Sequence, residues 1–289
     1  MTGNLDNSGR PSLGAVAISY NEERDLPGFL ENLSGWVDEI VVIDDGSSDR
    51  TEEIAAEYGA KVKFLRSPRQ AGEYFADQRN KGIDAATSEW LLHMDIDERV
   101  TAELAKEILA AIRDPAFDGY RFRRLNHFMH RPMRGGGWQD WNLVHLARRE
   151  RLRFSGMFHE RCEVDSPPGR IGQLASPMVH LNEDCFEKRL SKSGVYAEEV
   201  IKQIEDRGKR VGALDLFGRP LVEAVRKYIF KKGFLDGIPG VISALHAATA
   251  IFRAHAVVWD RQNRVERAEL EKTLADAWTS EGGDKLRQD

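Results

Sequence analysis

Four short apolar runs near the N-terminus, separated by stretches of helical character, constrain the fold of this chain most strongly. The runs are Ala15–Ile18, Ile40–Ile43, Val62–Leu65 and Trp90–Met94. Strands that alternate with helices form a parallel sheet, and nearly continuous apolar runs are typical of strands covered on both faces. The sequence therefore predicts an α/β fold with a mostly parallel sheet. The expected helices cover about Glu23–Leu33, Thr51–Tyr58, Glu73–Ala86 and Ala102–Arg113.

Two of these helices begin next to residues that can cap them. Asp49 precedes Glu52 by three residues, the spacing of a capping box, and Thr101 stands directly before the fourth helix. Side-chain oxygens at such positions accept hydrogen bonds from the free N–H groups of the first helical turn. We expect both residues to act as caps.

The pattern divides the chain into four parts. Residues 1–12 form a polar tail, residues 13–118 form the α/β half, and residues 119–185 mix strands with loops. Helical patterns return over residues 186–289, and the segment after about Arg264 reads as a charged tail. Five apolar residues of this last part are compatible with one helical face: Val241, Leu245, Ala248, Phe252 and Trp259.

Charge and cysteine content exclude several classes of protein. A net charge of −5 argues against a general nucleic-acid binder, because phosphate backbones are held mainly by clustered Lys and Arg. Two cysteines are too few for a disulfide framework, which indicates a reducing compartment. The N-terminus lacks the features of a secretory signal, and the apolar stretch Gly237–Trp259 contains His246, Arg253 and His255, which argues against a membrane span. We expect a cytoplasmic protein.

An acidic triplet, Asp95-Ile96-Asp97, follows the fourth apolar run directly. Residues two apart in an extended chain point to the same side, so both carboxylates can converge on one cation. Oxygen ligands at the carboxyl end of a strand suit Mg²⁺ or Mn²⁺, and this edge is where α/β sheets bind ligands. The alternative is an acidic turn whose carboxylates only complement the dipole of the following helix.

Polar turns also follow the first two strands. Ser19-Tyr20-Asn21-Glu22-Glu23 offers an aromatic face and polar groups, and Asp44-Asp45-Gly46-Ser47-Ser48-Asp49 offers carboxylates that a turn and a cap do not need. One of Asp44 and Asp45 is therefore available for recognition. The carboxyl ends of parallel strands meet at one edge, so all three polar turns open on the same side of the sheet.

These motifs, with Arg79-Asn80-Lys81-Gly82-Ile83 between them, resemble those of the family 2 glycosyltransferases, which have the GT-A fold. The match covers roughly residues 13–185. The resemblance implies a Rossmann-like nucleotide-binding half, an acceptor-side lobe over residues 119–185, and a C-terminal helical extension over 186–289. It also implies a nucleotide-sugar donor, a divalent metal (Mn²⁺ or Mg²⁺) and transfer with inversion.

The resemblance further implies roles for individual residues. Tyr20, Glu22 and Asp45 contact the nucleoside, and Asp97 is the main metal ligand, while Asp95 binds the ribose of the donor or supports the metal site. Arg79 lies near the diphosphate or the acidic motif. A structural Arg79, paired with a carboxylate at a strand end, is an equal alternative.

Inverting transfer needs a general base in the acceptor-side lobe. Glu160, beside His159, is the first choice and Asp140 is the second, while a surface salt bridge of Glu160 with Arg161 or Arg153 is the alternative. His180 completes the metal sphere by the resemblance, although a histidine after a strand is often structural.

The segments Phe154–Glu160, Met178–Leu181 and Gly233–Gly237 are similar to the lipopolysaccharide-core glucosyltransferase branch of the family. That similarity implies UDP-glucose as donor and a lipopolysaccharide-core or other envelope glycan as acceptor. The basic bias of the middle segment suits an anionic, lipid-linked glycan, and the C-terminal helices, with Phe230, Lys231 and Trp259, suit peripheral contact with the inner membrane.

Two other functions stay open at this point. A sugar nucleotidyltransferase also places a nucleotide on an α/β sheet, but the first strand is followed by no Gly-rich, basic phosphate loop. A non-catalytic protein that binds nucleotide or carbohydrate is the other.

Overall fold

The computed structural model describes residues 9–156 and 160–280. Its strands and helices follow in the order β1(Leu13–Ser19), α1(Leu26–Ser34), β2(Glu39–Asp44), α2(Thr51–Ala56), β3(Val62–Arg66), α3(Phe75–Ala85), β4(Trp90–His93), β5(Glu98–Arg99), α4(Ala102–Ala111), β6(Gly119–Phe128), β7(Arg131–Pro132), β8(Asn142–Arg148), β9(Leu152–Ser155), β10(Arg161–Val164), β11(Ile171–Gln173), β12(Met178–Glu183), α5(Phe186–Asp206), α6(Ala213–Val225), α7(Gly237–Asn263) and α8(Arg267–Ser280). The short helical turns are η1(Gly59–Lys61), η2(Trp138–Asp140), η3(Arg149–Arg151), η4(Arg226–Phe230) and η5(Gly233–Asp236).

The main sheet has the order β3-β2-β1-β4-β8-β6-β12-β5, with β7 and β11 also paired to β6. Strands β1 to β4 pair in parallel, as the alternation of strands and helices predicts. Strand β8 then inserts antiparallel between β4 and β6, and β5 pairs antiparallel with β12. The mixed second half gives the fold its GT-A character.

Helices cover both faces of the sheet. One face packs against apolar residues of α1, α2 and α4, such as Phe29, Ile54 and Ile108. The other face packs against α3 and β9, through Ile83 and Phe154. The continuous apolar strands fill the space between these layers, as expected for strands buried on both sides.

The predicted caps have different outcomes. Thr101 caps α4, because its hydroxyl accepts a hydrogen bond from Leu104 N at 3.1 Å. The capping box at Asp49 is wrong: its carboxylate accepts from the N–H groups of Thr51 and Glu23 at 3.0 Å each. Asp49 therefore ties the loop after β1 to the start of α2.

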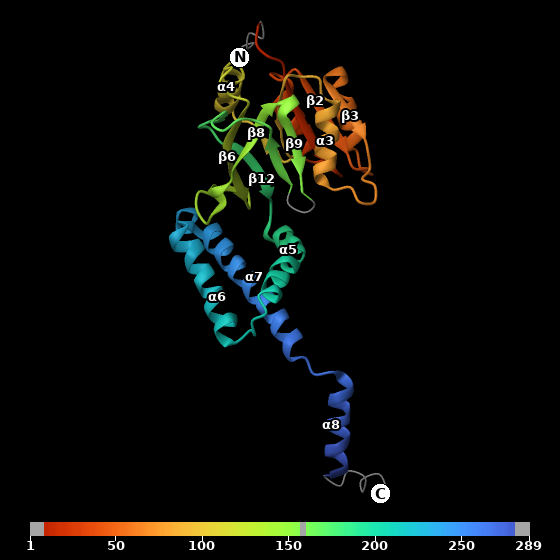
Figure 1. Ribbon diagram of the computed structural model, residues 1–289, viewed down its shortest axis with the longest axis vertical. Coiled ribbons are helices and arrows are strands. Elements are labelled where there is room, and N and C mark those ends of the chain that lie inside the picture. Colours follow the sequence, from red (N-terminus) through yellow and green to blue (C-terminus); the bar gives the residue numbers. More distant parts are fainter. Residues whose placement is uncertain (1–8, 157–159, 281–289) are drawn as a thin grey trace.

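Helices α5, α6 and α7 form a bundle beside the end of the sheet, and α8 extends away from it (Figure 1). The charged tail expected after Arg264 is helical over Arg267–Ser280. Of the apolar residues expected to share one face of α7, Leu245, Phe252 and Trp259 are exposed, while Ala248 is buried. The buried side of α7 is instead made largely of small residues: Gly240, Ser243, Ala244, Ala248 and Ala254.

Candidate functional site

The carboxyl ends of β1, β2 and β4 lie side by side at one edge of the sheet, since β1 pairs in parallel with both neighbours. Each end leads into one of the polar segments identified in the sequence. The edge faces the helical bundle (Figure 1). The candidate site is built at this edge.

Asp44 joins the loops after β1 and β2. Its buried carboxylate accepts hydrogen bonds from Ser19 Oγ at 3.0 Å and from the Ser47 N–H at 2.9 Å. Asn21 adopts a left-handed conformation (φ 56°), which asparagine tolerates better than most residues. Its side chain accepts from Ser48 N at 2.8 Å. Asp44 is thus fully used in holding the two loops together.

Asp45 and Tyr20 belong to these joined loops, with Asp45 partly buried and Tyr20 exposed. The Asp45 carboxylate accepts from both the backbone N and the Nε of Arg69, each at 2.7 Å. The Tyr20 ring is 60% exposed directly after β1. An exposed aromatic face beside a carboxylate suits a nucleobase, so the geometry favours Asp45 over Asp44 for recognition.

Asp95 is held by two arginines. Its Oδ1 accepts from Arg79 Nη2 at 2.6 Å, and its Oδ2 lies 3.4 Å from Arg124 Nη2. The buried Glu98 accepts from the Asp95 N–H at 2.8 Å and pairs with Arg124 at 2.5 Å. Burial, with Asp95 nearby, raises the pKa of Glu98 to about 8. The two guanidinium groups hold the pKa of Asp95 below its usual range, against the effect of burial.

Asp97 is in a different environment. Its Oδ2 lies 3.3 Å from His180 Nε2, and Asp97 O accepts from the Leu181 N–H at 2.9 Å. His180 Nδ1 contacts Asn126 Oδ1 at 2.7 Å, while Asn126 Nδ2 donates to Trp138 O at 2.8 Å. Since the Asn126 amide is oriented by that second bond, its oxygen faces Nδ1, which must carry the proton. The lone pair of a neutral His180 then points at Asp97.

A lone pair and a carboxylate oxygen 3.3 Å apart repel each other unless a cation or a proton lies between them. The two donors suit a divalent metal, and the Asn126 bond is of the kind that fixes the tautomer of a ligating histidine. In the described parts of the chain, no group of three or more His, Cys, Asp or Glu side chains gathers around one point. Two protein ligands nevertheless fit Mg²⁺ or Mn²⁺, which fill their remaining positions with water and phosphate oxygens.

Glu22 is a further acidic group in this region. Burial raises the pKa of Glu22 to about 7, and the negative charge of Asp97 acts in the same direction. The Glu22 N–H donates to Thr51 Oγ1 at 2.8 Å, so its backbone is fixed by the start of α2.

The two candidate bases occupy different places. Glu160 Oε1 accepts from Arg79 Nε at 2.7 Å, so its salt-bridge partner is Arg79 and neither Arg153 nor Arg161 as the alternative expected. Its Oε2 is buried and has no hydrogen-bond partner among the described residues. Asp140 is half-exposed and pairs with Lys231 at 2.7 Å, at the junction with the helical extension. His159 lies outside the described residues.

Arg79 is therefore the centre of the site's ion pairs. It is nearly buried (7% exposed) and joins Asp95 to Glu160, as the structural alternative for this residue expects. Two tryptophans lie in the acceptor-side lobe: Trp138 is packed against Phe128, while Trp141 is half-exposed with Arg124 at 5.7 Å from its ring. Only Trp141 has a face open to a sugar.

Sequence reasoning missed Asn126 and assigned no role to Arg124, Glu98 or Arg69. Asn126 stands opposite His180 in the pairing of β6 with β12, and Glu98 stands opposite His180 in the pairing of β5 with β12. These registers join segments more than 50 residues apart. One local feature could have pointed to Asn126: it is a polar residue in a strand that also carries Phe122 and Phe128.

The site combines polar loops at the edge of the sheet, the exposed ring of Tyr20 and a candidate cation site at Asp97 and His180. These features are typical of a nucleotide-binding α/β enzyme. The family model described as glycosyl transferase family 2 matches residues 15–164, just over half of the chain. The chain belongs to this family. It is a glycosyltransferase, which removes the sugar nucleotidyltransferase and the non-catalytic binding protein as alternatives.

Curated glycosyltransferases are similar to this chain over most of its length. The chain is 26% identical over 266 residues to the lipopolysaccharide core biosynthesis glycosyltransferase LpsC of Rhizobium meliloti, covering 85% of this chain and 93% of LpsC. It is 23% identical to an uncharacterized glycosyltransferase of Rickettsia felis, covering 83% of this chain and 87% of that protein. Among solved structures, glucosyl-3-phosphoglycerate synthase from Mycobacterium tuberculosis is 18% identical, with a TM-score of 0.45 and coverage of 60% and 72%.

Proposed function

We propose that this enzyme transfers a sugar, with inversion, from a UDP-sugar to a lipopolysaccharide-core or other cell-envelope glycan. Glucose is the sugar we favour. The similarity to LpsC over most of both chains supports the acceptor class. The family resemblance supports the donor nucleotide, and so does the exposed Tyr20 ring at the end of β1. We place the reaction on the cytoplasmic side of the inner membrane, where nucleotide sugars are made.

The observation that carries the proposal is the opposition of Asp97 and His180, with His180 oriented by Asn126. These two side chains would hold Mn²⁺ or Mg²⁺, which neutralises the charge that develops on the departing nucleoside diphosphate. Asp95 is saturated by Arg79 and Arg124, so it positions the segment that carries Asp97.

The protein's own part in the chemistry is to bind, orient and accept a proton. Tyr20, Glu22 and Asp45 hold the nucleoside at the ends of β1 and β2. Glu160 Oε2 accepts the proton of the acceptor hydroxyl as that oxygen attacks the anomeric carbon, while Arg79 holds Glu160 Oε1 in place. Asp140 is the second candidate for this base. A base with one oxygen fixed and the other unpartnered is oriented for a single proton transfer.

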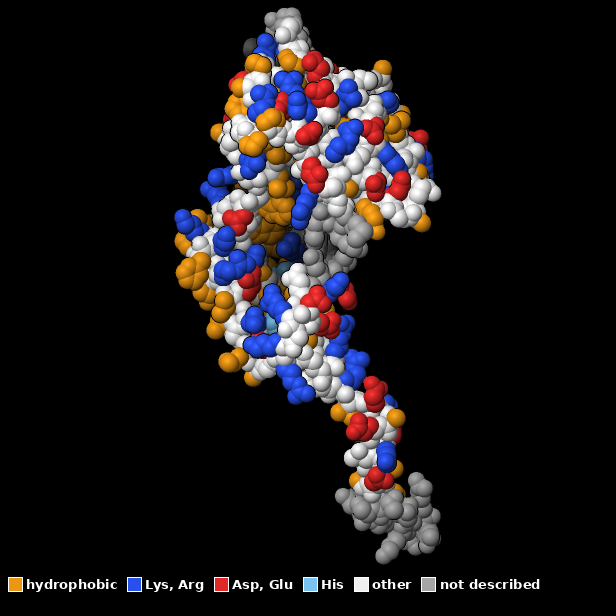
Figure 2. All heavy atoms as spheres, in the orientation of Figure 1, with side chains coloured by type: hydrophobic (Ala, Val, Ile, Leu, Met, Phe, Trp, Pro, Cys, Tyr) orange, Lys and Arg blue, Asp and Glu red, His pale blue; other side chains and the backbone are white. Residues whose placement is uncertain are grey.

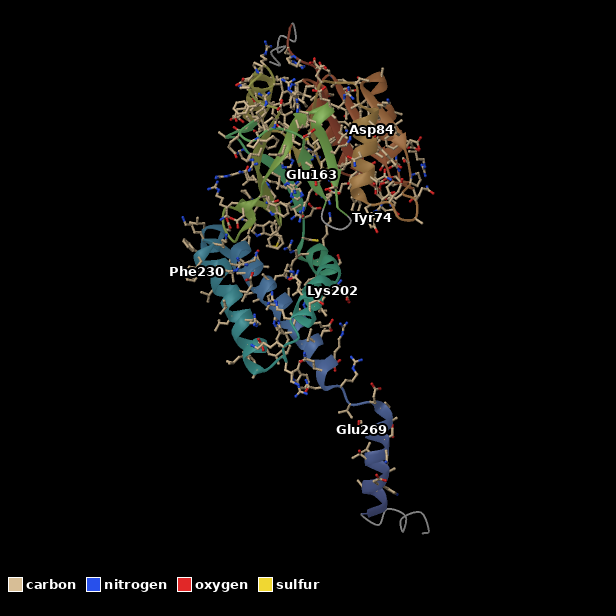
Figure 3. The ribbon with its side chains drawn as sticks, viewed as in Figure 1. Tyr74, Asp84, Glu163, Lys202, Phe230 and Glu269 are labelled. Carbon is tan, nitrogen blue, oxygen red and sulfur yellow. The ribbon has the colours of Figure 1, made fainter. Side chains whose placement is uncertain are left out.

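Calorimetry with UDP tests the proposal directly. We expect UDP to bind with a requirement for Mn²⁺ or Mg²⁺, and Asp97→Ala to remove most of the metal-dependent part of the affinity. The control is Asp84→Ala on α3, because Asp84 is an exposed carboxylate paired only with Arg153 among the described residues (Figure 3). Metal-independent UDP binding in the wild type, or equal losses in both variants, contradicts the proposed site.

A panel of nucleotide sugars tests the identity of the donor. Purified enzyme incubated with metal and a panel of nucleotide sugars is expected to hydrolyse or transfer from a UDP-sugar, with UDP-glucose fastest. A different preferred sugar corrects the donor and leaves the site assignment in place.

A further inference from the structure

Exposed large apolar side chains concentrate in one short stretch of the chain. Residues 9–183 expose five of them among the described positions: Tyr20, Phe75, Trp141, Leu143 and Leu181. Residues 214–238 alone expose ten: Leu214, Phe217, Leu221, Val222, Val225, Ile229, Phe230, Phe234, Leu235 and Ile238. A density this high on a folded protein marks a surface that contacts another apolar phase.

The stretch forms a continuous structural unit. On α6, exposed residues recur every three or four positions, at Leu214, Phe217, Leu221 and Val225, so they share one face of the helix. The turn through η4 and η5 continues the apolar surface with Phe230 at its outer edge (Figure 3). Figure 2 shows hydrophobic and basic side chains together along the outer side of the bundle. We call α6, η4, η5 and the first two turns of α7 the apolar hairpin.

Packing within the bundle leaves this surface open. Helix α7 turns small residues, such as Ala244 and Ala248, toward its neighbours and exposes Leu245 and Phe252. A surface helix usually turns its large apolar side chains toward the core, whereas α7 buries small side chains and exposes large apolar ones. The arrangement brings the helices close together and leaves the large side chains for an external partner.

The charge around the apolar hairpin is positive, although the whole chain carries a net charge of −5. Residues 210–240 contain six Lys or Arg and three Asp or Glu, which gives +6 − 3 = +3. Lys232 in the turn is exposed, and so are Arg131 and Arg134 on the neighbouring loop. Arg134 N donates to Asp236 Oδ1 at 2.6 Å, which places this loop against η5. Basic side chains beside an apolar face match an anionic bilayer, whose headgroups attract Lys and Arg while the acyl region accepts the apolar groups.

We propose that the apolar hairpin docks the enzyme on the surface of an anionic lipid bilayer, with α6 lying in the headgroup region. The choice of a bilayer over a protein partner rests on this positive rim and, through the proposed function, on a lipid-linked acceptor. The segment Gly233–Asn263 is long and apolar enough by composition to cross a membrane, and an 18-residue window within it has a mean hydropathy of 1.5. Its contacts with the rest of the protein favour a peripheral position, since Ser243 binds Trp138 Nε1 at 3.0 Å and Arg261 pairs with Glu205 of α5 at 2.9 Å.

The hairpin is fixed to the half of the enzyme that carries the candidate site. Gly136 N donates to Lys231 O at 2.8 Å, and the Asp236 carboxylate accepts from Arg134 N and Gly135 N. Gly135 lies so close to Lys232 that a Cβ built on it would be 2.0 Å from the Lys232 carbonyl oxygen. Docking therefore sets the orientation of the acceptor-side lobe relative to the bilayer.

Vesicle flotation with the full chain tests the proposal. We expect binding to vesicles of phosphatidylcholine and phosphatidylglycerol in equal parts, and weaker binding to phosphatidylcholine alone. The double variant F217S/L221S is expected to lower the partition coefficient on anionic vesicles by about tenfold or more, because two large apolar groups leave the interface. The variant R134E/K232E is expected to lower binding to anionic vesicles only, and added salt is expected to weaken the wild type.

The matched control is L270S/L274S on α8, where two exposed leucines have the same four-residue spacing as Phe217 and Leu221. It is expected to bind vesicles as the wild type does. Equal loss in both double variants, or wild-type binding that ignores lipid charge, overturns the proposal. A wild type that ignores vesicles but forms dimers that F217S/L221S abolishes assigns the surface to a second copy and also overturns it.

Metal-dependent UDP binding, measured on the same preparations, separates this inference from the proposed function. F217S/L221S is expected to keep that binding and its unfolding temperature, because neither residue contacts the site or the core. Loss of docking with UDP binding retained supports the inference. A wild type that docks but binds no UDP overturns the proposed function alone.

Discussion

The two aspartates that follow β4 have unequal roles because their neighbours differ. Asp95 pairs with two guanidinium groups, whereas Asp97 pairs with the imidazole of His180. The family resemblance already assigns metal binding to Asp97 and a ribose or supporting role to Asp95. The contacts of the two carboxylates are consistent with that proposal.

The orientation of His180 gives a prediction at the scale of one residue. Asn126→Ala removes the acceptor at His180 Nδ1, which frees the ring to rotate and to exchange its tautomer. We expect Mn²⁺ affinity to fall by about 10–100-fold, the usual effect of removing such an outer partner. Titration of Mn²⁺ followed by electron paramagnetic resonance measures it.

The control for this variant is Asn142→Ala, which removes an exposed Asn142–Gln173 hydrogen bond on β8. It is expected to leave Mn²⁺ binding unchanged. Unchanged metal affinity in folded Asn126→Ala contradicts the positioning role. Because Asn126 is buried, thermal unfolding of each variant is measured first.

The two candidate bases give a second prediction. Glu160→Gln removes the proton acceptor but keeps the size of the side chain, so kcat is expected to fall by about 10²–10⁴-fold with UDP binding little changed. Asp140→Asn is expected to keep most of kcat, because Asp140 is engaged by Lys231. Steady-state transfer rates measure both. The reverse pattern makes Asp140 the base.

At the scale of elements, the sequence predicted the parallel strands well and the second half less well. Strands β1 to β4 are marked by apolar runs whose meaning is local. The antiparallel insertion of β8 beside β4 depends on pairing between distant segments, for which no local signal exists. The sequence also left open what the apolar residues of α7 contact. Apolar periodicity identifies the apolar side of a helix, but it does not say whether that side meets the protein core or another apolar phase.

The junction at the start of β6 predicts a pH-dependent stability. The buried Asp118 accepts from Arg170 Nε at 2.6 Å and from Ser166 Oγ at 2.7 Å. The Arg170 hydrogen bond leads the contacts that hold the pKa of Asp118 below its usual range. A lowered pKa in the folded state stabilises the protein above the unfolded pKa of about 3.9, and this contribution is lost as the pH falls further.

Asp118→Asn is therefore expected to lower the free energy of unfolding by about 1–3 kcal/mol at pH 7, the range for hydrogen bonds to charged groups. The difference from the wild type is expected to shrink as the pH falls below about 4. Urea unfolding at several pH values measures it, with Asp84→Asn as an exposed control. A difference that stays constant to low pH shows that the Asp118 charge is not its source.

At the scale of the whole molecule, the acceptor-side lobe and the apolar hairpin are tightly packed where Gly135 meets Lys232. Gly135→Ala places a Cβ against the Lys232 carbonyl and must separate the two parts. We expect it to destabilise the protein by about 1–3 kcal/mol, as overpacking usually does. Gly218→Ala on α6, where a Cβ meets no atom within 4 Å, is expected to be neutral or stabilising.

Urea unfolding of the two glycine variants, with proteolysis near residue 232 as a local measure, checks this prediction. If Gly135→Ala and the wild type have the same free energy of unfolding, the backbone around Lys232 accommodates the added methyl group and the prediction is contradicted.

The close approach of Gly135 to Lys232 also has a geometric consequence for substrate choice. If the apolar hairpin is docked on a bilayer and packed tightly against the acceptor-side lobe, the candidate site lies at a fixed distance from the bilayer surface. Under the proposed docking, acceptors are then selected by the reach of their glycan from the lipid that anchors it. The terminal sugar of a glycan that is one unit too short does not reach the site, and that of a glycan one unit too long extends beyond it. Acceptor length would then be selected by the distance between site and bilayer, without a specific contact to the sugar.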